Sequence, residues 1–212
     1  MSSHYTLNDH TDFLSIRRIF DPYLNLGDIA YEYEDGFWKE DVIGHATPDF
    51  FGGYTNTINW NRFTLTALFT FSYGNDLIYQ KDVSDSGMSS LANRGTRVLN
   101  HYSEDNTSSN RPRSMWATTY MLSSLNVYDA SYLKLKTLSL SYNLPESICR
   151  KVRIKSASVY GTATNVFTIT SYPGPDPEVS DDPTSVIGGG RDVSTYPTVK
   201  SYTFGIRINF YS

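Results

Sequence analysis

Apolar and polar residues alternate along residues 201–210, near the end of the 212-residue chain. One parity holds only apolar side chains: Tyr202, Phe204, Ile206, Ile208 and Phe210. The other holds polar or small residues: Ser201, Thr203, Gly205, Arg207 and Asn209. Because successive side chains of a β-strand point to opposite faces, this pattern predicts a strand with one apolar and one polar face.

A longer strand of the same kind is predicted over residues 63–73. One parity is apolar: Phe63, Leu65, Ala67, Phe69, Phe71 and Tyr73. The other holds Thr and Ser, with Leu68 as its one exception. At about 3.3 Å per residue such a strand spans about 36 Å, or about 26 Å when tilted by about 45°. The tilted length fits the apolar band of an outer-membrane barrel, which is about 25 Å tall.

Three further strands are predicted over residues 54–60, 132–143 and 154–169. The second of these changes phase, since Leu133 and Leu135 lie on one parity and Leu138 and Leu140 on the other. A one-residue β-bulge near Lys136 would bring both pairs to the same face.

The connections between these strands alternate in length. Residues 61–62 and 143–153 make short links, whereas residues 74–131 and 171–200 are long and polar. Short periplasmic turns and long extracellular loops alternate in this way in outer-membrane barrels.

Five strands are too few to close a barrel, which needs about eight. We therefore expect an all-β fold, the C-terminal antiparallel strands of a large transmembrane β-barrel with long extracellular loops. Residues 1–50 would be mostly loop, and residues 51–212 barrel strands and loops.

Composition agrees with a barrel but does not single it out. Aromatic residues make up 15% of the chain, yet the mean hydropathy is −0.39 and no apolar run is long enough for a membrane helix. A soluble all-β carbohydrate-binding module would share these values and is the alternative. A secreted β-rich glycoside hydrolase is a third reading, but no carboxylate pair points to it. The net charge of −4 gives no indication of nucleic-acid binding.

No catalytic residue, metal ligand set or cofactor motif is predicted, so the chain is not expected to be an enzyme. Its four histidines lack ligand spacing, and Cys149 is its only cysteine. The carboxylates of residues 176–182 could bind Ca²⁺, but the prolines among them favour a solvated loop. The first ten residues also lack the features of a signal peptide. A barrel protein must be exported, so we expect a truncated or split chain that is non-functional alone.

Aromatic residues of the long connections are the candidate ligand contacts. Trp116 and Tyr120 could stack on the apolar faces of sugar rings or sit at the membrane interface. Tyr128, Tyr172 and Tyr196 lie close to strands, which favours the interfacial position.

Several segments resemble, in the same order, those of SusC/RagA-type TonB-dependent outer-membrane transporters. They are Gly27-Asp28-Ile29 with Tyr31, IGHATPDF at 43–50, FTFSYGND at 69–76, DASYLKLKTLSLSYNLP at 129–145, TNVFT at 164–168, Asp176-Pro177-Glu178, and residues 196–197 and 202–210. The similarity runs from about residue 27 to the end, and its shared order makes it specific.

The resemblance implies import of a bulky nutrient, an oligosaccharide or peptide, across the cell outer membrane. It also implies several partners: the plug and N-terminal barrel of the same transporter, a SusD-like surface lipoprotein, TonB acting through the missing N-terminal part, and the outer-membrane insertion machinery. Gly205, Ile208 and Phe210 fit the last-strand signal that this machinery is thought to read. The side chains expected to face lipid include Phe63, Leu65, Phe69, Phe71, Phe204 and Ile206.

Overall fold

The computed structural model of the chain describes residues 4–6, 25–35, 37–82, 93–113, 123–179, 190–193 and 196–211. The chain divides into two compact units. One comprises residues 47–75, 129–178 and 196–212 and contains all the long strands. The other comprises residues 1–46, 76–128 and 179–195 and is built from short strands and turns.

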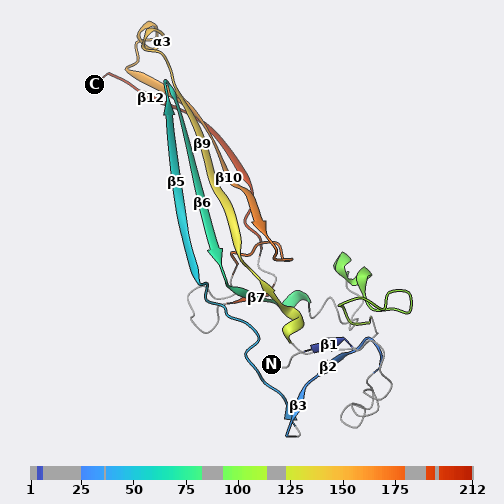
Figure 1. The fold of residues 1–212 in the computed structure, drawn as a ribbon. Helices are drawn as coiled ribbons and strands as arrows, with labels where there is room; N and C mark the ends of the chain where they lie inside the picture. Colours follow the sequence, from blue (N-terminus) through green and yellow to red (C-terminus); the bar gives the residue numbers. More distant parts are fainter. Residues whose placement is uncertain are drawn as a thin grey trace. The chain divides into compact units, whose positions relative to one another are not determined.

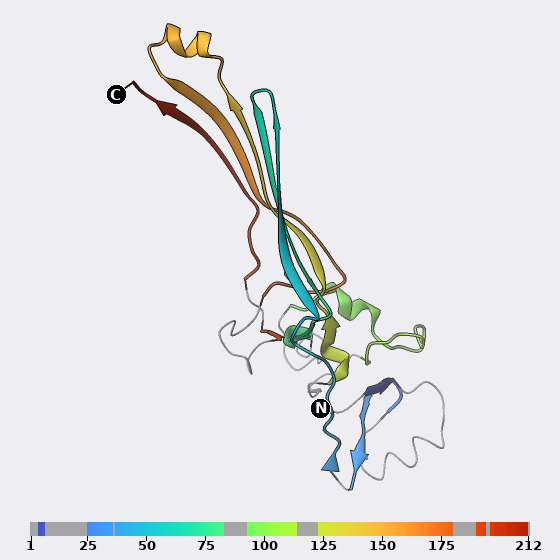
Figure 2. The ribbon, with the colours of Figure 1, turned by 60° about the vertical axis from the view of Figure 1, so that its left-hand side comes forward.

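The long strands form one antiparallel sheet in the order β12-β10-β9-β6-β5 (Figure 1). They are β5 (Phe50–Trp60), β6 (Phe63–Tyr73), β9 (Tyr132–Asn143), β10 (Ser156–Thr170) and β12 (Ser201–Asn209). Each pairs with the next long strand along the chain, so the sheet is an up-and-down meander that twists along its length (Figure 2). All five strands predicted from the alternation are confirmed, and the fold is all-β.

The largest difference from the predicted bounds is in β5, which begins at Phe50 rather than at residue 54. Gly52 and Gly53 hide the alternation in the sequence, because a residue without a side chain carries no face signal. Both glycines nevertheless pair with β6, opposite Phe71 and Thr70. Hydrogen bonding to a neighbouring strand therefore extends the element beyond its apolar pattern.

The predicted bulge lies at Lys136. Along β6 the consecutive residues Leu68 and Phe69 pair with Thr137 and Leu135, so Lys136 has no partner on that strand. On its other side, the β10 register also shifts, between Thr164 and Phe167. Asn165, within that shift, has a φ of 51°, a left-handed conformation that Asn tolerates better than most residues. The bulge places the leucines on either side of it on one face, as the sequence predicts.

The short connections lie together at one end of the sheet. One is the turn at Asn61 and Arg62, and the other contains the helix α3 (Glu146–Lys151). The N–H of Asn143 donates to the carbonyl of Arg62 at 2.9 Å, which joins the two connections. The C-terminal end of β12 lies at this end as well (Figures 1 and 2). Both long connections start from the opposite end, which confirms that the sheet sorts its connections by length.

The second unit consists of small sheets. β1 (His4–Thr6) pairs with β2 (Ile29–Tyr31), and β3 (Tyr33–Glu34) pairs with β4 (Phe37–Trp38). β7 (Asp76–Tyr79) lies between β8 (Val127–Asp129) and the parallel β11 (Arg191–Asp192). This unit also contains two 3-10 helices, η1 (Thr96–Asn100) and η2 (Ser124–Asn126). In the part of the chain that the structure describes, no helix is long and apolar enough to cross a membrane.

The turn between β5 and β6 generates a prediction. Asn61 has a φ of 55°, where a Cβ-branched residue is strongly disfavoured. We expect Asn61→Val to lower the free energy of unfolding by about 1–2 kcal/mol, whereas Asn61→Gly leaves it nearly unchanged. The midpoint of urea unfolding in detergent measures both. Equal midpoints for the two variants would contradict the left-handed turn.

Candidate functional site

The register of the sheet places most apolar side chains of the five strands on one face, with Phe51 and Leu68 among the exceptions. One row across the sheet consists of Trp60, Phe63, Tyr142, Val159 and Ile206. The next consists of Ile58, Leu65, Leu140, Gly161 and Phe204. Many of these large side chains are exposed, and Phe204 and Ile206 keep 82% and 68% of their surface accessible. We call this surface the apolar face.

Aromatic side chains gather at both ends of the apolar face. At the end with the short connections, the Phe63 ring lies 6.3 Å from Trp60 and 4.7 Å from Tyr142, measured between ring centroids. At the other end, the Phe50 ring lies 5.1 Å from Tyr73 and 6.2 Å from Phe71. Phe63 and Tyr73 are the first and last residues of β6. Aromatic rows thus border the apolar face at both ends. Their separation, once a strand tilt of about 45° is allowed for, is close to the apolar band of an outer-membrane barrel, which is about 25 Å tall.

The side chains predicted to face lipid all belong to this face. The register pairs Phe63 on β6 with Tyr142 on β9, and it pairs Leu65, Phe69 and Phe71 with leucines of β9. On β12, Phe204 pairs with Gly161 and Ile206 with Val159 of β10. Ile208 and Phe210 of the expected insertion signal share this parity, whereas Gly205 lies on the opposite face. Whether lipid covers these residues, and whether Gly205, Ile208 and Phe210 are read as a signal, stay predictions.

The structure contradicts the expectation for one of the loop aromatics. Tyr172 is buried, so the interfacial position predicted for its ring is wrong. Tyr128 is half-buried and Tyr196 is exposed, and the interfacial position of these two rings stays a prediction. The sequence analysis did not identify the aromatic rows at the two ends of the apolar face. Which rings lie side by side in a row depends on the register between strands, and a single strand's sequence does not show that register. Trp116 and Tyr120, the predicted glycan contacts, lie outside the described residues.

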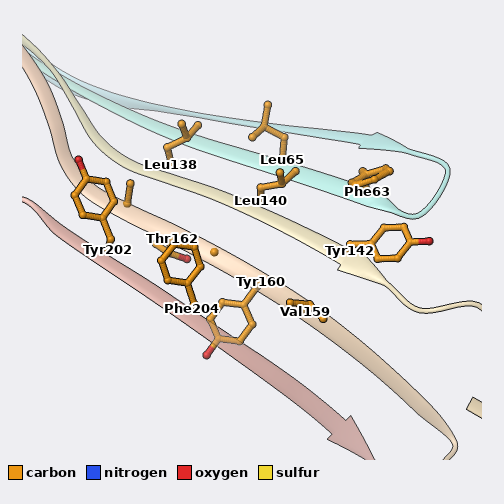
Figure 3. A pocket seen from close by; sticks show the side chains of 12 residues that line it. Phe63, Leu65, Leu138, Leu140, Tyr142, Val159, Tyr160, Thr162, Tyr202 and Phe204 are labelled. Carbon is orange, nitrogen blue, oxygen red and sulfur yellow. The ribbon is translucent and has the colours of Figure 1, made fainter.

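A shallow depression of about 480 Å³ interrupts the apolar face (Figure 3). Gly161 and Ala163 of β10 form its floor, and Leu65, Leu138, Leu140 and Phe204 are among its lining residues. The depression exists because two small residues follow each other on this face of β10, between strands that carry leucine and aromatic side chains.

The opposite face carries rows of hydroxyl and amide side chains that bond across the strands. Ser139 and Thr162 lie 2.9 Å apart, and Thr164 and Ser201 lie 2.6 Å apart, measured between their hydroxyl oxygens. The Nδ2 of Asn209 donates to Ser156 at 2.8 Å. Such cross-strand polar pairs stabilise a sheet and leave a hydrophilic surface. We call this surface the polar face.

Lys134 is the most deeply buried charge of the polar face, since none of its surface is accessible. Its Nζ donates to Oδ1 of Asp176 at 3.0 Å and to Oε2 of Glu178 at 2.7 Å. Lys136, at the bulge, donates to the other oxygen of Glu178 at 2.6 Å. Two lysines two positions apart on the strand thus reach one carboxylate. We call these residues, with Thr198, the lysine cluster.

The lysine cluster attaches both ends of the connection between β10 and β12 to the sheet. Asp176 and Glu178 follow β10, and Thr198, which precedes β12, donates its hydroxyl hydrogen to Oδ2 of Asp176 at 2.5 Å. Asp176 is buried, so the solvated-loop interpretation of this acidic run is wrong for that residue. A buried carboxylate needs a nearby cation and hydrogen-bond donors, and Lys134 and Thr198 supply them.

The environment lowers the pKa values of both loop carboxyls. Burial by itself would raise the pKa of Asp176, but hydrogen bonds from Thr198, the Glu178 N–H and Lys134 outweigh it. Burial likewise opposes the shift at Glu178, and Lys134 and Lys136 together lower its pKa. Both residues are therefore charged at neutral pH, which keeps the cluster paired.

A second group of charges organises the other unit. Asp82 is almost fully buried and accepts a hydrogen bond from Arg111 at 2.8 Å. The hydroxyl of Tyr128 donates to the other oxygen of Asp82 and accepts from Arg97 at 3.0 Å. Burial and the Asp82 carboxylate raise the pKa of Tyr128, so its hydroxyl stays protonated as a donor. These bonds join segments that lie within one long connection, residues 74–131.

Comparisons with known proteins agree with this geometry. The chain is 34% identical over 173 residues to TonB-dependent receptor P3 of Formosa agariphila, an alignment that covers 80% of the chain and 17% of that protein. A structure of the RagAB peptide importer in its open-open state matches with a TM-score of 0.69 and 25% identity, over 99% of the chain and 21% of that structure. A second RagAB structure, that of a peptide transporter, matches with a TM-score of 0.71 and 24% identity, over 98% of the chain and 22% of that structure.

The chain therefore spans about a fifth of the length of the proteins it matches, from 17% to 22%. No family model matches it. The identity and structural similarity agree with the order of segments on which the SusC/RagA resemblance rests.

The lysine cluster predicts an asymmetric response to two lysine substitutions. Lys134→Met would leave Asp176 buried without its cation, and we expect a loss of about 3 kcal/mol in the free energy of unfolding. Lys136→Met is the matched control: the Lys136 side chain is 40% exposed, and its loss should cost at most about 1 kcal/mol. Urea midpoints and protease cleavage within residues 171–200 measure the two effects. A similar cost for both variants would contradict the buried role of Lys134.

The lowered carboxyl pKa values predict that acid loosens this connection. A carboxyl whose pKa is lower in the folded than in the unfolded state stabilises the fold at a pH above its unfolded pKa, which is about 4 for these two groups. This stabilisation is lost as the pH falls through the folded pKa. We expect hydrogen exchange at residues 171–179, corrected for intrinsic rates, to accelerate between about pH 5 and pH 2. Asp176→Asn with Glu178→Gln should remove this pH dependence, and its persistence would exclude these carboxyls as the cause.

Proposed function

Since the chain belongs to the SusC/RagA-type TonB-dependent transporters, we propose that it supplies the C-terminal β-barrel portion of an outer-membrane nutrient importer. In this proposal β5, β6, β9, β10 and β12 form part of the barrel wall. The apolar face contacts lipid, and the polar face lines the interior. The imported nutrient is bulky, an oligosaccharide or a peptide.

The observation that carries the proposal is the exposure of the apolar face across five strands in register. Leaving large apolar side chains in water is unfavourable by about 25 cal/mol per Å² of apolar surface, and soluble monomers rarely expose a continuous apolar patch of this kind. Contact with acyl chains removes that cost. The aromatic rows at its two ends are where amphipathic or flat rings meet the lipid headgroups.

The sorting of the connections supports an orientation. Short periplasmic turns and long extracellular loops are typical of such barrels, so the turn at Asn61, the helix α3 and the C-terminal end of β12 would face the periplasm. The lysine cluster would then hold the β10–β12 connection at the extracellular side. This connection is one of the places where the chain could contact nutrient.

Several partners follow from the same proposal. The outer strands β5 and β12 each have one edge without a neighbour in this sheet, and an unpaired edge in lipid costs several kcal/mol per lost hydrogen bond. The plug and the remaining barrel strands would complete the structure. A SusD-like lipoprotein at the extracellular mouth and TonB, acting through the N-terminal part, would complete the import system.

A soluble carbohydrate-binding module is the competing interpretation. It would need water on the apolar face or a second layer that covers it. Nothing in the sheet favours that arrangement, because its polar face, not its apolar face, holds the buried charges. Retention of the purified chain on a polysaccharide affinity gel, in the absence of detergent, would favour the module.

A matched pair of substitutions on β6 tests which face meets lipid. Leu65 and Thr66 are neighbours that lie on opposite faces, as the third and fourth of the eleven residues of β6. Arginine on the lipid face costs about 2–4 kcal/mol at the bilayer midplane and less toward the interface, whereas a lumen position tolerates it. We expect Leu65→Arg to reduce the heat-modifiable, protease-resistant form in the outer membrane about tenfold, and Thr66→Arg to leave most of it.

The experiment requires the chain in its longest natural form with an export signal, followed by membrane fractionation. Thr66→Arg controls for the added charge and for the expression level. Equal losses in the two variants would reject a lipid-facing role for Leu65. A soluble periplasmic product for the unsubstituted chain would reject the membrane assignment altogether.

A further inference from the structure

β10 and β12 meet in a reciprocal arrangement of glycine and aromatic residues. Tyr160 pairs with Gly205, and the next pair is Gly161 with Phe204. Because neighbouring residues point to opposite faces, Tyr160 covers Gly205 on the polar face and Phe204 covers Gly161 on the apolar face. Figure 3 shows the Tyr160 ring extending from β10 across β12 and the Phe204 ring extending from β12 across β10.

Contact distances explain why these positions hold glycine. A Cβ atom at Gly205 would lie 2.7 Å from Cε1 of Tyr160 and still closer to Cζ and the hydroxyl oxygen. A Cβ atom at Gly161 would lie 3.2 Å from Cδ1 and Cε1 of Phe204. Neither glycine has a positive φ, so the backbone conformation does not require glycine at either place. The requirement is space for the ring of the facing residue.

A glycine also faces an aromatic ring between β5 and β6, and a neighbouring glycine there faces no ring. Gly52 of β5 pairs with Phe71 of β6, and a Cβ atom at Gly52 would lie 2.9 Å from Cζ of that ring. Gly53 pairs with Thr70 instead, and a Cβ atom there would meet no atom closer than 3.4 Å. An aromatic ring over a cross-strand glycine is a known means of stabilising a strand that glycine would weaken.

Register is the property that this arrangement can control. The alternation of faces excludes a slip of β12 by one residue, because that would exchange its apolar and polar sides. A slip by two residues keeps the faces and is not excluded by alternation. It would place Tyr160 opposite Thr203 or Arg207, each of which has a Cβ atom where the ring now lies.

We propose that Tyr160 with Gly205, and Phe204 with Gly161, form an interlock that fixes the register of the last strand on β10. Gly205 is then a positioning residue that acts through Tyr160, beyond any part it has in an insertion signal. The two roles differ in a testable way. A signal read by insertion machinery depends on Gly205 itself, whereas the interlock depends on the pair. The inference concerns strand pairing and does not depend on what covers the apolar face.

Disulfide formation reports the register directly. The hydroxyl oxygens of Thr164 and Ser201 lie 2.6 Å apart, so cysteines at these two positions would bridge in the native register. Cysteines at Thr164 and Thr203 would bridge only after a slip by two residues, because diagonal neighbours are about 7–8 Å apart. Both reporters carry Cys149→Ala, which removes the one native thiol. The exported chain is oxidised in the periplasm, and its cross-links are read by mass spectrometry.

The interlock predicts a specific order among the variants. Gly205→Ala should lower the ratio of native to slipped cross-link about tenfold, since forcing a methyl group into a packed site typically costs enough to shift an equilibrium by that much. Adding Tyr160→Ala to Gly205→Ala should recover most of the ratio, because the ring that collides with the new methyl group is gone. Gly53→Ala, where a Cβ atom has room, should leave the ratio unchanged.

Three results would overturn the interlock. One is a double variant as impaired as Gly205→Ala alone, which would assign Gly205 to recognition by insertion machinery. Another is a loss of the ratio in Gly53→Ala as large as in Gly205→Ala. The third is the absence of the native cross-link in the otherwise unsubstituted reporter. Fractionation of the same cells is scored separately, so a chain outside the membrane with the native cross-link would contradict the proposed function and leave the interlock standing.

Discussion

The structure depends on one constraint, the two-residue periodicity of side chains held in register across five hydrogen-bonded strands. Each strand has an apolar and a polar side, but only the register joins these sides into two continuous faces. A slip of any strand by one residue would put aromatic and leucine side chains among the hydroxyls of the polar face. The bulge at Lys136 serves the same constraint, because without it the leucines of β9 on either side would lie on opposite faces.

The two faces use different physical means of stabilisation. The apolar face is open, so its favourable energy depends on the medium or partner that covers it. On the polar face, cross-strand hydroxyl bonds join neighbouring strands, and the lysine cluster attaches the connection after β10 to the sheet. A sheet of this kind resembles the wall of a barrel, in which one side is matched to lipid and the other organises loops and an aqueous interior. The similarity to the RagAB structures, over nearly the whole chain, agrees with that picture.

The local pattern of the sequence was sufficient to predict the five long strands, the bulge and the sorting of the connections between these strands, but not the short strands of the other unit. It was insufficient where a feature depends on which residues face each other. Lys134 contacts Asp176, which lies 42 residues later in the chain, and Tyr160 faces Gly205 on another strand. Neither contact produces a pattern in the nearby sequence. Lys136 at the predicted bulge and Lys134 two positions before it could have suggested an anionic partner. The helix α3 was not predicted, because it is only one or two turns long. Its ends nevertheless carry ordinary helix signals: Pro145 and Glu146 at the start, and the basic Arg150 and Lys151 at the end.

In the proposed barrel wall, one face of this sheet meets lipid and the other does not. The most direct measurement places single cysteines at each position from residue 63 to residue 73, in a Cys149→Ala background, and attaches a spin label after isolation of outer membranes. Relaxation by oxygen, which concentrates in lipid, is then compared with relaxation by a water-soluble nickel chelate. The account predicts alternation with a period of two residues, with oxygen dominant at Phe63, Leu65, Phe69 and Phe71. Uniformly high access of the nickel chelate along both parities would contradict it.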